Sequence, residues 1–134
     1  MKTFIIHSDG GARGNPGPAA IGVVIKSDNG TLIEEISKTI GETTNNQAEY
    51  QAIIAGLETA KKLGAEAVEC FLDSELVVKQ LRREYKVKNK ELAPLFVKVH
   101  NLSLQFKKIS FTHVMREKNK AADKLVNIAL DAVV

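Results

Sequence analysis

The first third of the chain has the hydrophobic pattern of three β-strands joined by short connections. Residues 3–8 contain the apolar run Phe4-Ile5-Ile6, which predicts a buried strand. Apolar side chains alternate with other positions over residues 19–26, and a third strand returns over residues 31–39. Between them, Ser27-Asp28-Asn29-Gly30 has the Asn-Gly pair that suits the positive φ of a hairpin turn. The pattern predicts a three-stranded meander.

Beyond residue 40 the apolar spacing takes on the period of amphipathic helices, interrupted by short strands. Side chains of Thr43-Thr44-Asn45-Asn46 are suited to cap the first helix, and Leu63-Gly64 to end it. We expect helices to about residue 62, from 73–74 to about 81, over about 92–102 and from 118 to about 133, and strands over 67–72 and 109–114. The order β-β-β-α-β-α-α-β-α predicts an α/β fold, a five-stranded mixed sheet flanked by helices, in a single domain over residues 1–134.

Composition agrees with one ordinary soluble domain. The 134 residues are 44% hydrophobic and 26% charged, which is enough chain to bury a core and too little for a second domain. The single Cys70 lies in an apolar run and cannot form an internal disulfide, so we expect a reducing, cytoplasmic location. No signal peptide is visible, and no apolar stretch approaches the roughly eighteen residues of a membrane span. The net charge of +3 is compatible with a polyanionic partner without requiring one.

Four carboxylates fall at positions that the core pattern does not explain. Asp9 follows the first apolar run, and Asp73 follows the strand over 67–72. Glu49 lies on the helix stripe that should face the sheet, and Asp123 lies early in the last helix at the edge of its apolar face. Taken singly, each has an ordinary structural explanation: a turn, a favourable helix dipole or an N-cap.

Taken together, the four carboxylates point to one edge of the sheet, since α/β proteins bind ligands at the carboxyl ends of their strands. Carboxylates gathered there without intervening Lys or Arg would repel one another unless cations were bound, and oxygen ligands suit Mg²⁺ or Mn²⁺. Zinc is disfavoured because Cys70 is isolated and because His7, His100 and His113 lack the spacing of zinc ligands. The pattern therefore predicts a divalent-cation site.

Four segments of the chain resemble the motifs of type 1 ribonuclease H. They are Asp9-Gly10-Gly11-Ala12-Arg13-Gly14-Asn15-Pro16-Gly17, Thr44-Asn45-Asn46-Gln47-Ala48-Glu49, Asp73-Ser74 and His113-Val114-Met115-Arg116-Glu117-Lys118-Asn119-Lys120-Ala121-Ala122-Asp123. Their order and separation extend the resemblance over practically the whole chain. It implies the ribonuclease H-like fold and hydrolysis of the RNA strand of RNA·DNA hybrids to 5′-phosphate and 3′-hydroxyl ends. It also implies two divalent cations, Mg²⁺ with Mn²⁺ as a substitute.

The resemblance assigns metal binding and catalysis to the positions matched by Asp9, Glu49, Asp73 and Asp123. In the mechanism that it implies, Asp9 bridges both ions and Asp123 helps to hold the ion that activates water. The other ion would steady the leaving 3′-oxygen, as two metals about 3.5–4 Å apart do in such displacements.

Substrate contacts are implied in the same way. A hybrid displays 2′-hydroxyls on one strand only, and glycine backbone and amide side chains are suited to contact them. The matching candidates are Gly10, Gly11, Asn15, Asn45 and Gln47. Thr44 and Asn46 match positions that grip a phosphate of the DNA strand, and Ser74 would lie beside the scissile strand. Capping and turn formation are alternative roles for residues 44–46, and both roles can hold at once.

The chain departs from the family pattern in two places. Many members carry a long basic, aromatic-rich protrusion, whereas only residues 82–90 stand there and the chain has no Trp, so we expect a weaker or differently distributed grip on the hybrid. Many members also have a loop histidine that assists proton transfer or product release. Here His113 lies ten residues before Asp123 in a predicted strand, and Arg116 matches an arginine of some compact members. Arg13 has no assigned role.

Other function classes stay open at this point. A module that only binds hybrid or duplex RNA would keep the glycines and Asn45 without needing all four acids. A related two-metal nuclease of transposase-like type usually lacks the Asn-Asn-Gln-Ala-Glu pattern of residues 45–49. Cleavage of duplex RNA as a further activity is also open. The joint presence of the four acids favours an enzyme, and we expect a monomer that acts on RNA·DNA hybrid.

Overall fold

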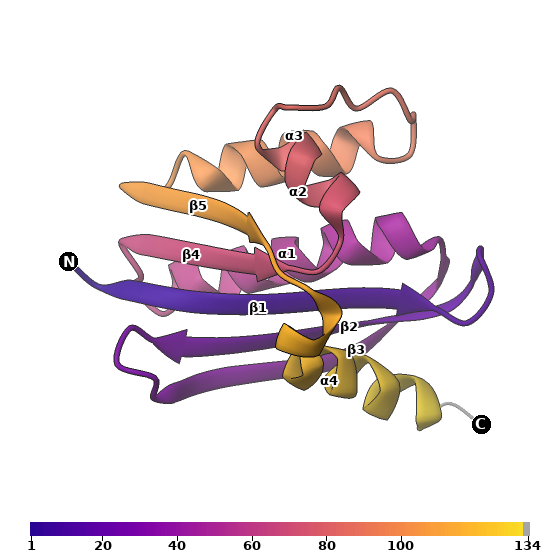
Figure 1. Ribbon diagram of the computed structural model, residues 1–134, viewed down its shortest axis with the longest axis horizontal. Helices are drawn as coiled ribbons and strands as arrows, with labels where there is room; N and C mark the ends of the chain where they lie inside the picture. Colours follow the sequence, from indigo (N-terminus) through magenta and orange to yellow (C-terminus); the bar gives the residue numbers. More distant parts are fainter. Residues whose placement is uncertain (133–134) are drawn as a thin grey trace.

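The computed structural model describes residues 1–132 and has one five-stranded sheet with helices on both faces (Figure 1). Its elements are β1 (Thr3–Ala12), β2 (Gly17–Ser27), β3 (Leu32–Thr43), α1 (Asn45–Lys62), β4 (Ala67–Leu72), α2 (Glu75–Leu81), α3 (Ala93–Ser103), β5 (Lys108–His113), the 3₁₀ turn η1 (Arg116–Lys118) and α4 (Lys120–Asp131). The strand order is β3-β2-β1-β4-β5. β1 pairs antiparallel with β2 and parallel with β4, and β5 is parallel to β4. The predicted mixed sheet is therefore confirmed.

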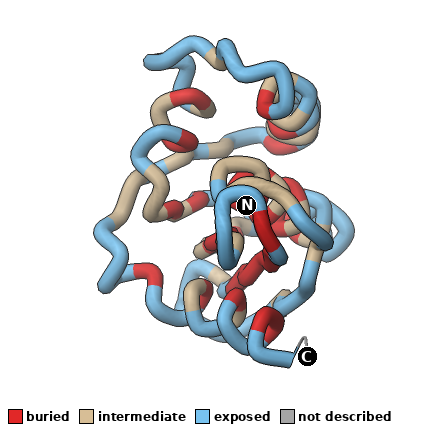
Figure 2. The backbone as a smooth tube through the Cα atoms, turned by 90° about the vertical axis from the view of Figure 1, so that its right-hand side faces the viewer, coloured by how far each residue is buried: buried red, intermediate tan, exposed pale blue. Residues whose placement is uncertain are grey.

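Different helices cover the two faces of the sheet. α1 packs across β1 and β2 with α3 beside it, whereas α4 lies over β2 and β3 on the opposite face. Most residues of the hydrophobic core lie between the sheet and the helices of the α1 side, and Figure 2 marks the buried segments in red. A small second cluster, made by Ala20, Val126, Ala129 and Leu130, lies under α4. No helix in residues 1–132 is both long and apolar enough to cross a membrane.

α4 can approach β2 closely because β2 carries a glycine where the two elements meet. A Cβ built on Gly22 would lie 2.1 Å from the carbonyl oxygen of Ala122. The next residue, Val23, points to the opposite face and is fully buried in the main core. The first turn of α4 is thereby held against the sheet near the middle of β1, which pairs with β2 at this level through Asp9 and Gly22.

β1 is longer than the sequence predicts. The glycine-rich segment was expected to end the strand after Ser8, but β1 continues through Asp9 to Ala12. Gly10 and Gly11 keep their places in the ladder because β2 supplies antiparallel partners for them at Ile21 and Ala20. Only residues 13–16 form the loop, so Asp9 lies inside a strand and not at its end.

The helix boundaries largely follow the expected capping chemistry. Thr44 is the N-cap of α1 and forms a capping box with Gln47, and Leu63 and Gly64 end the helix, with Gly64 at φ +86°. Ser74 caps α2 through the amide of Val77. The last helix begins two residues later than predicted, after η1. It is described to Asp131, and the predicted end near residue 133 lies outside the described residues.

Candidate active site

Parallel pairing of β1 with β4 brings two of the predicted carboxylates together. Ser8 lies opposite Leu72 in the register, so Asp9 and Asp73 follow at the same level of neighbouring strands. β4 ends at Leu72 and the chain turns into α2, whereas β1 continues past Asp9. The side chain of Asp73 is therefore free to turn toward Asp9 at the end of the β1–β4 ladder.

Close packing of α1 on β1 brings the third carboxylate to the same place. A Cβ on Gly10 would lie 2.2 Å from the backbone carbonyl of Ala48, so the helix can reach the strand only at a glycine. The amide of Gly10 donates a buried hydrogen bond of 2.9 Å to Oε1 of Glu49. Glu49 thus points inward, as its place on the helix stripe predicts.

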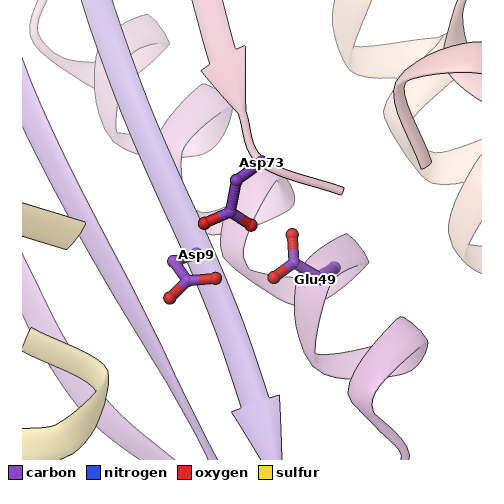
Figure 3. A group of neighbouring side chains, drawn as sticks. All are labelled: Asp9, Glu49 and Asp73. Atoms are coloured by element: carbon purple, nitrogen blue, oxygen red, sulfur yellow. The ribbon is translucent and has the colours of Figure 1, made fainter. Parts of the chain in front are cut away.

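Asp9, Glu49 and Asp73 form a cluster of oxygen atoms (Figure 3). One carboxylate oxygen from each lies within 4.8 Å of the others, and Asp9 and Glu49 are buried. Burial raises the pKa of Asp9 to about 6, and the charges of Asp73 and Asp123 add to the rise. Burial and the neighbouring Asp9 raise the pKa of Glu49 well above its usual value. Three acids held this close repel one another when they are ionised.

Asp123 reaches the cluster from the other face of the sheet. It lies in the first turn of α4 with its side chain 34% exposed, outside the group whose oxygens lie within 4.8 Å of one another. It nevertheless lines the same cleft as Asp9, and its charge contributes to the raised pKa of Asp9. Nη2 of Arg116 lies 4.0 Å from Oδ1 of Asp123, so an arginine does approach the acids, although its side chain is 82% exposed.

The four carboxylates line one cleft of about 490 Å³. Its other walls come from the end of β1, the start of α1, Ser74, Arg116 and one face of α4. Oε2 of Glu49 is buried and has no hydrogen-bond partner among the described residues. Such an orphaned, buried oxygen, in a donor set made only of carboxylates, fits a hard divalent cation such as Mg²⁺ or Mn²⁺.

Comparison with known proteins agrees with this geometry. The profile of the family described as "Reverse transcriptase-like" matches residues 7–129. The structure is similar to that of LC11-RNase H1 in complex with an RNA/DNA hybrid, with a TM-score of 0.91 and 47% identity over 96% of each chain. The chain belongs to the type 1 ribonuclease H family. A "Ribonuclease H" of Ruthia magnifica subsp. Calyptogena magnifica is 31% identical over 99% of both chains.

Some ribonuclease H relatives are longer than this chain. It is 46% identical to the "Bifunctional protein Rv2228c" of Mycobacterium tuberculosis over 96% of its own length but only 35% of that protein. It is also 46% identical to a "Ribonuclease HI" of Halobacterium salinarum, over 93% of this chain and 63% of the relative. The chain thus spans about a third of the Mycobacterium tuberculosis protein and less than two thirds of the Halobacterium salinarum protein.

Some of the predicted substrate-binding residues line the cleft in the structure, and others do not. Within the cleft wall are Gly10, Gly11, Asn45, Asn46 and Ser74. Asn15, Thr44 and Gln47 do not line it, and their side chains hold the neighbouring backbone. Oδ1 of Asn15 accepts from the amide of Asn45, and Oε1 of Gln47 accepts from Thr44 in the capping box.

Two side chains that the sequence left uncertain now have positions. Arg13 reaches α4, where its Nη2 lies 2.5 Å from Oδ1 of Asp131, an exposed ion pair that connects the β1–β2 loop to the last helix. His113 is the last residue of β5, in register with Leu72, as the strand pattern predicted, and it is not part of the cleft wall.

Sequence reasoning gave no role to Asn119, the residue before α4. It is 1% exposed, and its Nδ2 donates to the carbonyl oxygen of Ser8 at 2.9 Å and lies 3.4 Å from Oδ2 of Asp73. An asparagine just before a helix normally indicates an N-cap, so its local sequence gave no sign of contact with Asp73.

Proposed function

We propose that this chain is an endoribonuclease that hydrolyses the RNA strand of RNA·DNA hybrids. The observation that carries the proposal is the buried, all-carboxylate cluster of Asp9, Glu49 and Asp73 in an open cleft. Membership of the ribonuclease H family and the complex of LC11-RNase H1 with a hybrid support the choice of substrate. Cleavage would leave 5′-phosphate and 3′-hydroxyl ends.

Asp9, Glu49 and Asp73 would hold divalent cations, with Asp123 completing the set from α4. We propose that two ions bind there, Mg²⁺ or Mn²⁺ in its place. They would activate the attacking water and stabilise the leaving oxygen. The carboxylates themselves bring the negative charge that gathers the cations beside the scissile phosphate.

The rim of the cleft would recognise the hybrid. Gly11 and Asn45 offer a backbone and an amide beside the cluster, which suits contact with the 2′-hydroxyls that distinguish the RNA strand. Asn46 and Ser74 line the same wall and would contact the phosphate backbone. Arg116, largely exposed at the mouth of the cleft, is suited to attract a phosphate. Asn15, Thr44 and Gln47 would act by fixing this rim.

Asp73→Asn tests the proposal most directly, because it keeps the shape of the side chain and an oxygen that can accept from Asn119. Removal of a metal-binding carboxylate should exceed the roughly 10- to 100-fold losses known for residues around metal ligands, so we expect cleavage to fall by more than about 100-fold. Binding of a labelled RNA·DNA hybrid should remain measurable. Asp28→Asn, in the exposed β2–β3 turn, is the matched control and should cleave normally.

The substrate is tested by comparing labelled RNA·DNA, RNA·RNA and single-stranded RNA with Mg²⁺, with Mn²⁺ and with chelator. We expect the RNA strand of the hybrid to be cut fastest and the chelator to stop the reaction. Faster cutting of duplex RNA would overturn the choice of substrate. Hybrid binding without cleavage by the wild-type protein would instead identify a binding module.

A further inference from the structure

Asn119 occupies a helix N-cap position but does not act as a cap. The side chains of Ser, Thr, Asp and Asn normally satisfy backbone amides of the first helical turn. Asn119 makes no such bond to α4 and is turned into the protein, where it is 1% exposed. Its Oδ1 has no hydrogen-bond partner among the described residues. Burying this amide costs free energy that helix capping does not explain.

The contacts of Asn119 join three of the four segments that carry the acids of the cleft. Its Nδ2 donates to the carbonyl oxygen of Ser8, the residue before Asp9, at 2.9 Å. The same Nδ2 lies 3.4 Å from Oδ2 of Asp73. The backbone carbonyl of Asn119 accepts the amide of Asp123 at 3.1 Å, in the first turn of α4. One residue therefore touches β1, the end of β4 and the start of α4.

The chemistry of the site favours an amide at this position. A flipped amide would place Oδ1 against the carbonyl of Ser8 and the carboxylate of Asp73, so the observed orientation is the one that avoids repulsion. A Lys or Arg would neutralise the acids that gather the cations, and an Asp or Glu would repel Asp73. A serine hydroxyl is too short to replace an amide that spans both acceptors. A neutral donor of this length can hold Asp73 without competing with a cation.

We propose that Asn119 is a positioning residue of the carboxylate cluster. Its side-chain amide holds Asp73 at the end of β4 against the backbone of β1, which keeps the oxygens of Asp73 and Asp9 close enough to share cations. This inference rests on the proposed metal-dependent function of the cleft. It predicts that loss of the amide weakens cation binding more than it weakens the fold.

The test compares Asn119→Ala and Asn119→Ser with the wild-type protein and with Asn101→Ala, an exposed asparagine of α3. Cation affinity is measured without nucleic acid by calorimetric titration with Mn²⁺, and stability by urea unfolding in chelator. The Mg²⁺ concentration that gives half-maximal cleavage is a third readout. Serine is a favoured N-cap, so Asn119→Ser restores any capping role but not the contact with Asp73.

We expect both Asn119 variants to bind Mn²⁺ about 10- to 100-fold more weakly than the wild type, the range found when partners of metal ligands are removed. Half-maximal cleavage by both variants should need correspondingly more Mg²⁺, while their affinity for the hybrid stays unchanged. Asn101→Ala should match the wild type in every measurement. If Asn119→Ala does not fold, the serine variant carries the test. Wild-type Mn²⁺ affinity in a folded Asn119→Ser protein would overturn the inference. Absence of cation binding by the wild-type protein would instead overturn the proposed function.

Discussion

Removing the charge of Asp9 should stabilise the protein in the absence of metal while it abolishes cleavage. The pKa of Asp9 rises from 3.8 to about 6, first because the carboxyl is buried and then because Asp73 and Asp123 lie nearby. Since each pKa unit corresponds to about 1.4 kcal/mol, ionised Asp9 costs the folded state about 3 kcal/mol. Asp9→Asn removes this cost and replaces a carboxylate beside Glu49 with an amide that can donate a hydrogen bond to it.

The sign of the pH dependence follows from the raised pKa. A carboxyl with a higher pKa in the folded state favours folding while it is protonated, and this advantage is lost as the pH rises from about 4 through about 6. The wild-type protein should therefore lose stability over that window, and Asp9→Asn should lose less. We expect the two to be similar at pH 4 and the variant to be more stable by about 3 kcal/mol at pH 8.

Urea unfolding in chelator at pH 4, 6 and 8 measures this difference, with Asp28→Asn of the β2–β3 turn as the control for a lost surface charge. Equal stability of wild type and Asp9→Asn at pH 8, or a difference that grows toward acid, would refute the reasoning. Adding Mn²⁺ should reverse the order, because a cation at about 1,000 times its dissociation constant stabilises the wild-type fold by about 4.1 kcal/mol. Asp9→Asn should gain much less from the cation.

Three further substitutions test contacts between elements of the fold, each by urea unfolding. Gly10→Ala places a methyl group 2.2 Å from the α1 backbone and should cost about 3 kcal/mol or more, or prevent folding, with loss of helical circular dichroism. Tyr50→Phe leaves the buried Oε1 of Gln80 without the 2.7 Å hydrogen bond that links α1 to α2 and should cost about 1–3 kcal/mol. Arg13→Ala removes an exposed ion pair with α4 and should lower the free energy of unfolding by less than about 1 kcal/mol. A larger loss would contradict the prediction that this pair contributes little.

Local chemistry was enough to predict most of the elements. Thr44 and Gln47 form the capping box that their spacing indicates, and β4 has the predicted boundaries because its apolar run is flanked by polar residues. The end of β1 was predicted wrongly because Gly10 and Gly11 are poor strand residues by themselves. Their strand conformation depends on the pairing with β2, which sequence propensity does not contain.

The site was predictable to the extent that it follows from topology. Asp9 and Asp73 lie side by side because Ser8 and Leu72 are in register on neighbouring parallel strands, although only β4 ends there, and Glu49 points inward because of its helix phase. The contact of Asn119 with Ser8 joins residues 111 positions apart, and that of Arg13 with Asp131 joins residues 118 positions apart. Such contacts require the final packing of α4, which no local pattern specifies.

The arrangement of the cleft makes stability and cation affinity oppose each other. Close backbone packing at Gly10 and Gly22 fixes the backbones of α1 and α4 on the sheet, and so keeps Glu49 and Asp123 in the same cleft as Asp9. Repulsion among the ionised acids is therefore held in the folded protein and would be relieved if a divalent cation bound among the oxygens. A substitution that lowers the repulsion should strengthen the metal-free fold and weaken cation binding together, as is common for preorganised sites. On the proposed function, the same packing that makes the metal-free protein less stable would prepare the cluster to bind cations.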